Sequence, residues 1–164
     1  MAEGLSDRFL KIDREKYGII EGVTDHDFYT NSMHVPVYYQ ISIKDKIDIE
    51  AKYHHLGNGG HISYVELDGY PDKQTVKNII DYAFNNTDMS YMGINFKEVQ
   101  CKNCGKKIES SLHECQYCGS KDIQVIQRVS GYLAYIERFC EGKRHEANRR
   151  RAHGSVKNGT VKVE

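Results

Sequence analysis

The sequence has no tryptophan, only two prolines and no long uninterrupted run of apolar residues. A membrane-spanning helix needs at least about 18 mostly apolar residues, and no segment approaches that length. The first residues lack the basic-then-apolar order of a secretory signal peptide. The formal net charge is zero, with 23 basic and 23 acidic residues, so the chain offers no global attraction to nucleic acid or to a membrane. We therefore expect a cytoplasmic protein that binds neither of them directly.

The composition is that of a folded globular chain. Hydrophobic residues make up 39% and charged residues 28% of the 164 residues, and twelve tyrosines supply aromatic bulk. This length suffices for one domain of ordinary size, with or without a small appendage. Four of the five cysteines fall into two closely spaced pairs, which in a cytoplasmic chain indicates metal binding more than disulfides.

Local patterns predict an α/β chain. The β-branched and aromatic run at 35–43 predicts one strand, and alternation at 61–67 predicts a second. Apolar residues at helical spacing predict a helix at about 73–86, with Asp72 as its N-cap. Two strands and one helix are too few to close a sheet, so we expect this chain to complete something larger.

The last residues, 143–164, are basic at first and then rich in glycine, serine and asparagine. This composition predicts a flexible tail. Within it, the three arginines at 149–151 are typical of a solvated helix face, with phosphate or partner binding as the less favoured alternative.

The two cysteine pairs read CKNCGKK and CQYCGSK, and each pair is followed by a glycine. Two such knuckles provide four thiolates around one ion, the arrangement of a closed, structural zinc site. A redox-active or unliganded pair is the alternative, and the shared glycine disfavours it. The predicted zinc ligands are Cys101, Cys104, Cys115 and Cys118. The remaining cysteine, Cys140, is expected to be a small apolar residue that packs beside Phe139.

Shortly after the predicted zinc ribbon comes RVSGY, residues 128–132. This combination resembles the C-terminal end of anaerobic (class III) ribonucleoside-triphosphate reductases, which are glycyl radical enzymes. Further segments resemble that family in the family's order and together cover nearly the whole chain: RFLKIDREKYGIIEGVTDHDFYTNSMHVPV, KIDIEAKYHHLGNGGHISYVELDG, RVSGYLAYIERF and KRHEANRRR.

The resemblance implies that Gly131 carries a stable backbone radical. A Cα radical is delocalised over the flanking peptide groups and needs a planar Cα, which only glycine provides without steric clash. The family's radical is installed by a separate activase that cleaves S-adenosylmethionine at an iron–sulfur cluster. The implied fold is the C-terminal portion of a glycyl radical enzyme's α/β barrel, with a zinc ribbon and a glycyl radical loop, incomplete on its own.

The resemblance also divides the chain into segments. Residues 1–96 are expected to form the last part of the barrel and residues 97–124 the zinc ribbon. Residues 125–142 are expected to hold the glycyl radical loop and the following helix, and residues 143–164 the tail.

The family's radical passes to a cysteine on a facing loop, whose thiyl abstracts the ribose 3′-hydrogen so that the 2′-hydroxyl leaves as water. That cysteine and the family's allosteric region have no counterpart here, because four cysteines serve the metal and Cys140 follows Gly131. We therefore expect three partners: a larger reductase chain that carries the missing parts, the radical activase and ribonucleoside triphosphates. The chain is expected to be either a separately encoded subunit, as Met1 suggests, or a shortened form of a full enzyme. It should not reduce nucleotides alone.

Two polar, glycine-containing clusters beside the predicted strands are candidate substrate contacts. Alternatively, they satisfy only the backbone of their own loops. The candidate residues are Asn31, Ser32, His34, Asn58, Gly59, Gly60 and His61. The other histidines considered, His26, His54, His55 and His113, are expected at the surface.

Two other functions are open. The chain could be a spare part that replaces the oxygen-damaged glycine region of an intact reductase. It could also be a non-enzymatic ribbon that binds nucleic acid through four lysines, although these are few and only Tyr117 is at hand for base stacking. The four are Lys102, Lys106, Lys107 and Lys121.

Overall fold

The structure is a computed structural model that describes residues 4–58, 60–109, 112–128 and 131–155. Its strands form two sheets, one parallel and one antiparallel. Within the described residues, every helix is too short or too polar to cross a membrane.

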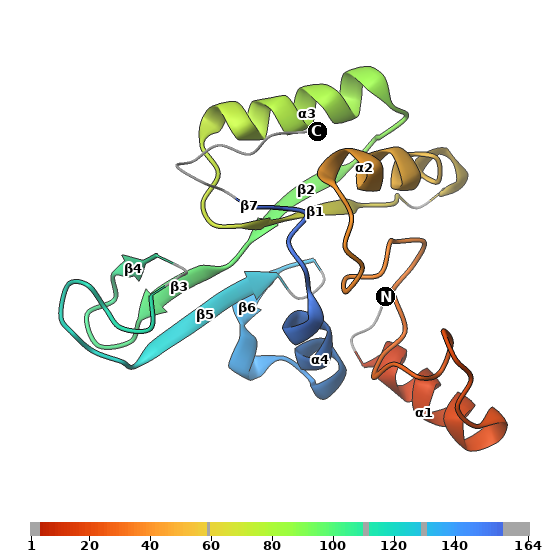
Figure 1. Ribbon diagram of the computed structural model, residues 1–164, viewed down its shortest axis with the longest axis horizontal. Coiled ribbons are helices and arrows are strands. Elements are labelled where there is room, and N and C mark those ends of the chain that lie inside the picture. Colours follow the sequence, from red (N-terminus) through yellow and green to blue (C-terminus); the bar gives the residue numbers. More distant parts are fainter. Residues whose placement is uncertain (1–3, 59, 110–111, 129–130, 156–164) are drawn as a thin grey trace.

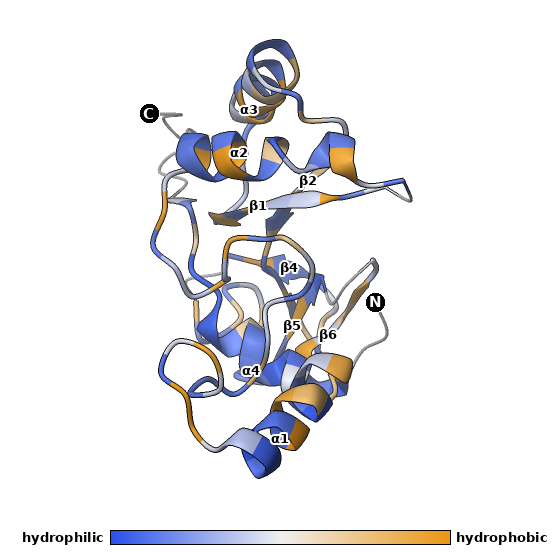
Figure 2. Cartoon of the chain, turned by 90° about the vertical axis from the view of Figure 1, so that its right-hand side faces the viewer, coloured by the Kyte–Doolittle hydropathy of each residue, from blue (hydrophilic) through white to orange (hydrophobic). Residues whose placement is uncertain are grey.

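The parallel sheet has the order β2-β1-β7. Strand β1 (Ser63–Asp68) pairs with β2 (Met92–Phe96) on one side and with β7 (Gly154–Ser155) on the other. Helices α2 (Ile43–Ala51) and α3 (Lys73–Asn86) both cover one face of this sheet, as Figures 1 and 2 show. The C-terminal part of the described chain thus returns, through β7, to a sheet built mainly from residues 63–96.

The main hydrophobic core lies between these two helices and the sheet. Both helices begin at a side-chain cap: Ser42 accepts the amide of Asp45, and Asp72 accepts the amide of Thr75. Capping satisfies amides that have no partner within the helix. Apolar residues at helical spacing then face the sheet, and the buried set is Ile43, Ile47, Ala51, Val65, Leu67, Ile79, Ala83 and Met89.

The antiparallel sheet has the order β4-β3-β5-β6 and continues directly from the parallel one, since only Lys97 separates β2 from β3. Its strands are β3 (Glu98–Cys101), β4 (Lys107–Ile108), β5 (Ile123–Arg128) and β6 (Leu133–Tyr135). In the hairpin of β5 and β6, Arg128 pairs with Leu133, so the hairpin's connection holds Gly131.

Helices α1 (Leu5–Tyr17) and α4 (Glu141–Arg149) lie together at the end of the molecule away from α3 (Figure 1). The short helices η1 (His54–Leu56) and η2 (Ile136–Arg138) complete the fold. The Arg14 guanidinium donates to the carbonyls of Thr24 and His26, both at 2.5 Å, and ties α1 to the segment that follows it.

The structure confirms the helix at 73–86 with its Asp72 cap, and the second strand, which spans Ser63–Asp68. The strand predicted at 35–43 is wrong. This segment is a turn, in which the Tyr39 amide donates to the Pro36 carbonyl, and it leads into α2. The β-branched composition of the segment favours a strand. The Ser42 cap, followed by Ile43, Ile47 and Ala51 at helical spacing, instead starts a helix at its end.

The flexible tail predicted from residue 143 is also wrong as far as residue 155. Residues 141–149 form α4, and β7 then pairs Gly154 with Leu67. The remainder of that segment, 156–164, lies outside the described residues. Helix α4 is polar in sequence, and its buried face combines Ala147, which packs beside Phe139, with the charged residues described below.

Candidate functional site

The two cysteine knuckles have the same backbone construction. The Gly105 amide donates to the Cys101 carbonyl at 2.9 Å, and the Gly119 amide donates to the Cys115 carbonyl at 2.8 Å. Both glycines are left-handed, with φ of +70° and +69°. A residue with a Cβ is disfavoured in this conformation, which explains why glycine follows each pair.

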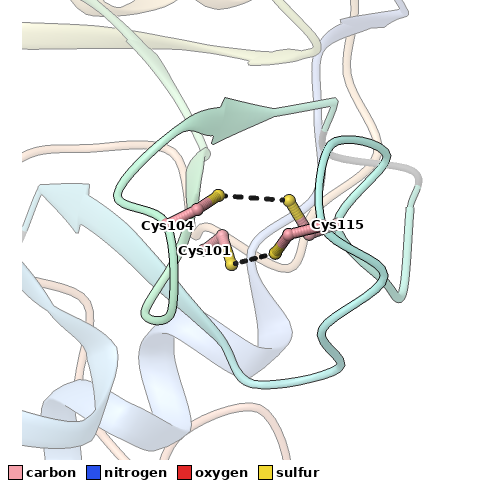
Figure 3. Close-up of side chains that lie close together, drawn as sticks. Cys101, Cys104 and Cys115 are labelled. Carbon is pink, nitrogen blue, oxygen red and sulfur yellow. Dashed lines mark hydrogen bonds between the residues drawn. The ribbon is translucent and has the colours of Figure 1, made fainter.

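The knuckles bring four sulfurs to one place (Figure 3). The Sγ atoms of Cys101 and Cys118 lie 3.6 Å apart, as do those of Cys104 and Cys115. A disulfide needs about 2.05 Å, whereas neighbouring thiolates on a tetrahedral zinc ion lie about 3.8 Å apart when each Zn–S bond is about 2.3 Å. The donor set and its spacing therefore fit a metal ion such as zinc.

Local hydrogen bonds favour the thiolate form at one of these positions. The Ser120 amide, and then the Asn103 side-chain amide, lower the pKa of Cys118 to about 6. Asn103 Nδ2 lies 3.7 Å from this sulfur. A sulfur that is ionised near neutral pH is ready to bind a cation.

A cavity of about 390 Å³ lies between the two sheets and α4. Its wall includes six of the residues singled out in the sequence: Asn31, Ser32, His34, Gly60, His61 and Gly131. Asn58 is exposed and does not line this cavity, and Gly59 lies outside the described residues. The structure thus brings both polar clusters to the same place as the glycine, although they precede it in the chain by 70 to 100 residues.

Gly131 lies exposed on this wall, and its surroundings do not require a glycine. Its φ lies outside the left-handed region, and a Cβ built on it meets no described atom within 4 Å. Neither backbone conformation nor close packing therefore explains the residue. The two preceding positions, 129 and 130, lie outside the described residues.

Ser32 differs from Gly131 in that its backbone conformation does favour a glycine. It is not a glycine, yet its φ is +59°. Such a conformation costs free energy in a residue with a side chain and is often found where the chain binds a ligand. Beside it, Asn31 Nδ2 donates to Glu146 Oε2 at 3.4 Å, which joins the N-terminal polar cluster to α4.

Buried charges make up much of the remaining wall, and one of them, Arg150, was wrongly expected on a solvated helix face, since its side chain is only 7% exposed. The carboxylate of Glu146 binds Lys143 Nζ at 2.6 Å and Arg150 Nη2 at 2.7 Å. Arg150 Nη1 also donates to the Arg128 carbonyl at 2.9 Å, three residues before Gly131. Arg128 in turn donates to the Tyr64 hydroxyl at 2.9 Å. The helical spacing of residues 143, 146 and 150 was the only signal for this cluster.

Burial shifts the pKa values of two groups in this wall. It raises the pKa of Glu66, although Arg150 and Asn95 partly offset the effect, and Asn95 Nδ2 donates to its Oε2 at 2.6 Å. It lowers the pKa of His153 to about 4, and nearby Lys46 lowers it further. His153 Nδ1 accepts the Glu66 amide at 2.9 Å, so this ring is neutral in the folded chain.

One histidine expected at the surface is buried. His54 is only 4% exposed, and its ring nitrogens lie 3.1 Å from Ser90 Oγ and 3.0 Å from Ser63 Oγ. The expectation was therefore wrong, because the helical turn at 54–56 packs this ring against β1. His55 and His113 are exposed, as predicted, and His26 is half-buried.

Comparisons with known proteins agree with this arrangement. Residues 2–153 match the sequence profile of the family described as anaerobic ribonucleoside-triphosphate reductase. The reductase of Enterobacteria phage T4 is 41% identical over 165 residues, covering 93% of this chain and 26% of the relative. The reductase of Escherichia coli K12 is 37% identical, covering 93% of this chain and 22% of the relative.

A solved structure described as an anaerobic ribonucleotide reductase shares the fold, with a TM-score of 0.74 at 22% identity. The match covers 92% of this chain and 23% of that one. The chain thus spans about a quarter of the length of the relatives it matches. The match of the family profile to nearly the whole chain shows that this protein belongs to the anaerobic ribonucleoside-triphosphate reductase family.

Proposed function

We propose that this chain is the glycyl-radical-bearing part of a cytoplasmic anaerobic ribonucleoside-triphosphate reductase, and that Gly131 is the radical residue. The observation that carries the proposal is the position of Gly131 on the cavity wall, where neither φ nor packing calls for a glycine. A backbone radical does call for one, because the radical Cα must become planar. Family membership supplies the chemistry in which such a radical takes part.

The four cysteines would hold a structural zinc ion that keeps the ribbon closed. Strand β3 runs into the first knuckle at Cys101, and β5 leaves the second knuckle and ends beside Gly131. Since β3 and β5 are paired, a closed ribbon fixes one side of the hairpin that carries the glycine. We assign the zinc this positional role and no part in the chemistry, because all four ligands come from the protein.

In the assembled enzyme the parallel sheet with its two helices would form part of the family's α/β barrel. Residues 1–96 then belong to that barrel, 97–124 to the ribbon, and 125–142 to the radical loop and the start of the following helix. The rest of the reductase would supply the thiyl cysteine and the allosteric region. A separate activase, acting with S-adenosylmethionine, would install the radical.

The cavity would receive part of a ribonucleoside triphosphate. Asn31, Ser32 and Gly60 offer amide, hydroxyl and backbone groups on its wall, suited to hydrogen bonds with ribose or phosphate. Lys46 and Arg128 add positive charge to the same wall. Asn58 is exposed outside the cavity, so we do not place it among the substrate contacts.

The nucleic-acid alternative receives no support from the ribbon surface. Lys102 forms ion pairs with Asp122 at 3.3 Å and Glu137 at 3.2 Å. The Lys106 ammonium lies over the ring of Tyr117, 4.4 Å from its centre, and occupies one face on which a base could stack. The cations of this surface are thus largely paired within the chain.

The test is anaerobic activation of this chain with the activase, S-adenosylmethionine, a reductant and the complementary part of a reductase. Electron paramagnetic resonance should show a doublet, because the unpaired electron couples to the one remaining α-hydrogen of the glycine. Protein grown on glycine deuterated at Cα should give a collapsed signal. A doublet that survives in Gly131→Ala would refute the assignment.

A further inference from the structure

A second group of metal-binding side chains lies apart from the ribbon, on and behind the cavity wall. It consists of His34, Glu50 and His61, and one ligand atom from each lies within 4.8 Å of the others. The three come from different places in the fold: the loop after residue 28, the end of α2 and the segment before β1. Both histidines line the cavity, while the carboxylate lies behind them.

The carboxylate of Glu50 is fully buried, and its two oxygens differ. Oε1 accepts the Val35 amide at 2.9 Å and also binds the Lys46 ammonium. Oε2 has no hydrogen bond among the described residues, although His34 Nδ1 lies 3.4 Å from it. One oxygen is therefore held in place by the protein, and the other is presented toward the histidines.

His61 is the second buried group that lacks a partner. The residue is 5% exposed, and its Nε2 has no hydrogen bond to any described residue. Its ring stacks on that of His34, with centroids 4.5 Å apart and planes 21° apart. Buried polar atoms are almost always satisfied, so two such atoms beside each other need an explanation.

We propose that His34, Glu50 and His61 bind a divalent first-row transition-metal ion, distinct from the ion held by the cysteines. Two imidazole nitrogens and one carboxylate oxygen form the donor set of open zinc sites and of non-haem iron(II) sites. With three protein ligands, at least one coordination position stays open. Since both histidines line the cavity, that position faces the space where a small ligand would bind.

A simple His34–Glu50 ion pair explains the structure less completely, because it leaves His61 Nε2 buried without a partner. A metal ion satisfies the unpaired atoms of Glu50 and His61 together. The contacts on Glu50 Oε1 are then outer-shell contacts, which orient a ligand and are a regular feature of metal sites. Lys46 competes for the carboxylate but occupies only Oε1, so Oε2 is left for a metal.

His54 provides an internal contrast. It is buried beside His61, with ring centroids 4.7 Å apart, but both of its nitrogens have serine partners. His54, which lies outside the proposed metal site, thus has a hydrogen-bond partner for each ring nitrogen, unlike His61. His55, the next residue along the chain, is exposed and outside the cluster, which makes it the matched control for weak surface binding.

The experiment titrates the zinc-loaded chain with Co²⁺ under anaerobic conditions and needs neither the activase nor the rest of a reductase. We expect one Co²⁺ per chain in addition to the ribbon zinc, with weak visible bands and no thiolate-to-cobalt charge transfer. X-ray absorption at the cobalt edge should show nitrogen and oxygen neighbours only. Sulfur neighbours, or no cobalt bound beyond the ribbon, would overturn the proposal.

Variants then locate the ion. His34→Gln and His61→Ala should each weaken Co²⁺ binding by at least about 100-fold, while His55→Ala should bind as the unaltered chain does. His34 is partly exposed, so His34→Gln decides the question if His61→Ala fails to fold. Retention of Co²⁺ by a folded His34→Gln variant would contradict the site. The proposed radical function is unaffected by either result, because its signal is measured at Gly131.

Discussion

Replacement of Gly131 by alanine separates the two explanations for this glycine. If the residue serves a turn or a close contact, a methyl group must strain the backbone or displace a neighbour. The structure shows neither requirement: φ lies outside the left-handed region, and an added Cβ meets no described atom within 4 Å. The change should therefore leave the fold intact and remove only the capacity to carry a radical.

The expected size of the effect on stability follows from this geometry. Where alanine adopts the native backbone without strain, replacing glycine lowers the entropy of the unfolded chain and stabilises a protein by about 0.4–1 kcal/mol. Gly131→Ala should therefore be neutral or slightly stabilising.

Two glycines in the same chain serve as matched controls. In Gly142→Ala the new Cβ would lie 2.8 Å from the Asp7 carboxyl carbon, an overpacked contact that should cost about 1–3 kcal/mol. Gly105→Ala forces a Cβ into the left-handed region at φ +70°, which costs roughly 1–2 kcal/mol before any loss of metal.

The assay combines urea denaturation of the three variants with spectroscopy after anaerobic activation. Gly131→Ala should unfold at the same or a slightly higher urea concentration than the unaltered chain and give no doublet. Gly142→Ala should unfold earlier yet keep the radical in its folded fraction. A loss of more than about 1 kcal/mol in Gly131→Ala would refute the reasoning, because the glycine would then have a structural role.

Three further predictions test other parts of the structure. Activated chain exposed to air should be cut at or beside Gly131, since oxygen adds to a carbon radical; mass spectrometry should find unactivated protein whole, and equal cleavage of both would contradict the radical. Cys118→Ser should release the ribbon metal, measured by elemental analysis, yet keep most of the helical circular dichroism, because the core beneath α3 shares no residue with the ribbon. His153 has a pKa of about 4 in the fold against an ordinary 6.5, so below pH 6.5 the unfolded chain gains a proton that the folded chain excludes, and stability falls as the pH falls. Denaturation at pH 7 and pH 5 should show a loss of about 2 kcal/mol from this group, absent in His153→Gln; equal losses in both proteins would contradict it.

The features predicted correctly from the sequence depend on short-range patterns. The cysteine pairs carry their geometry in their spacing and in the following glycines, and α3 carries its cap and apolar stripe within 15 residues. The strand predicted at 35–43 was wrong because its composition favours a strand while the Ser42 cap ends the segment in a helix start. Composition alone does not decide whether such a segment forms a strand or leads into a helix.

The placement of the charged groups in the cavity wall could not be predicted, because the contacts that join them to the rest of the fold span long stretches of the chain. Asn31 meets Glu146 across 115 positions, and His153 meets the Glu66 amide across 87. Each of these residues, taken alone, is typical of a solvated surface. The return of the chain to β1 through β7 places His153 against Glu66, and this strand pairing has no local signature in the sequence.

The same long-range contacts bear on how Gly131 is positioned. The hairpin that holds it is fixed on one side by the ribbon, through the pairing of β3 with β5. At the end of β5 itself, Arg150 holds the Arg128 carbonyl, while Glu146 holds Arg150. Removing one partner from such a buried network leaves the others unpaired, so the network resists partial rearrangement. A radical that must act at a fixed distance needs this kind of support, because small displacements of reacting groups cost large factors in rate. On the proposed function, the buried charges of α4 thus serve to position the glycine.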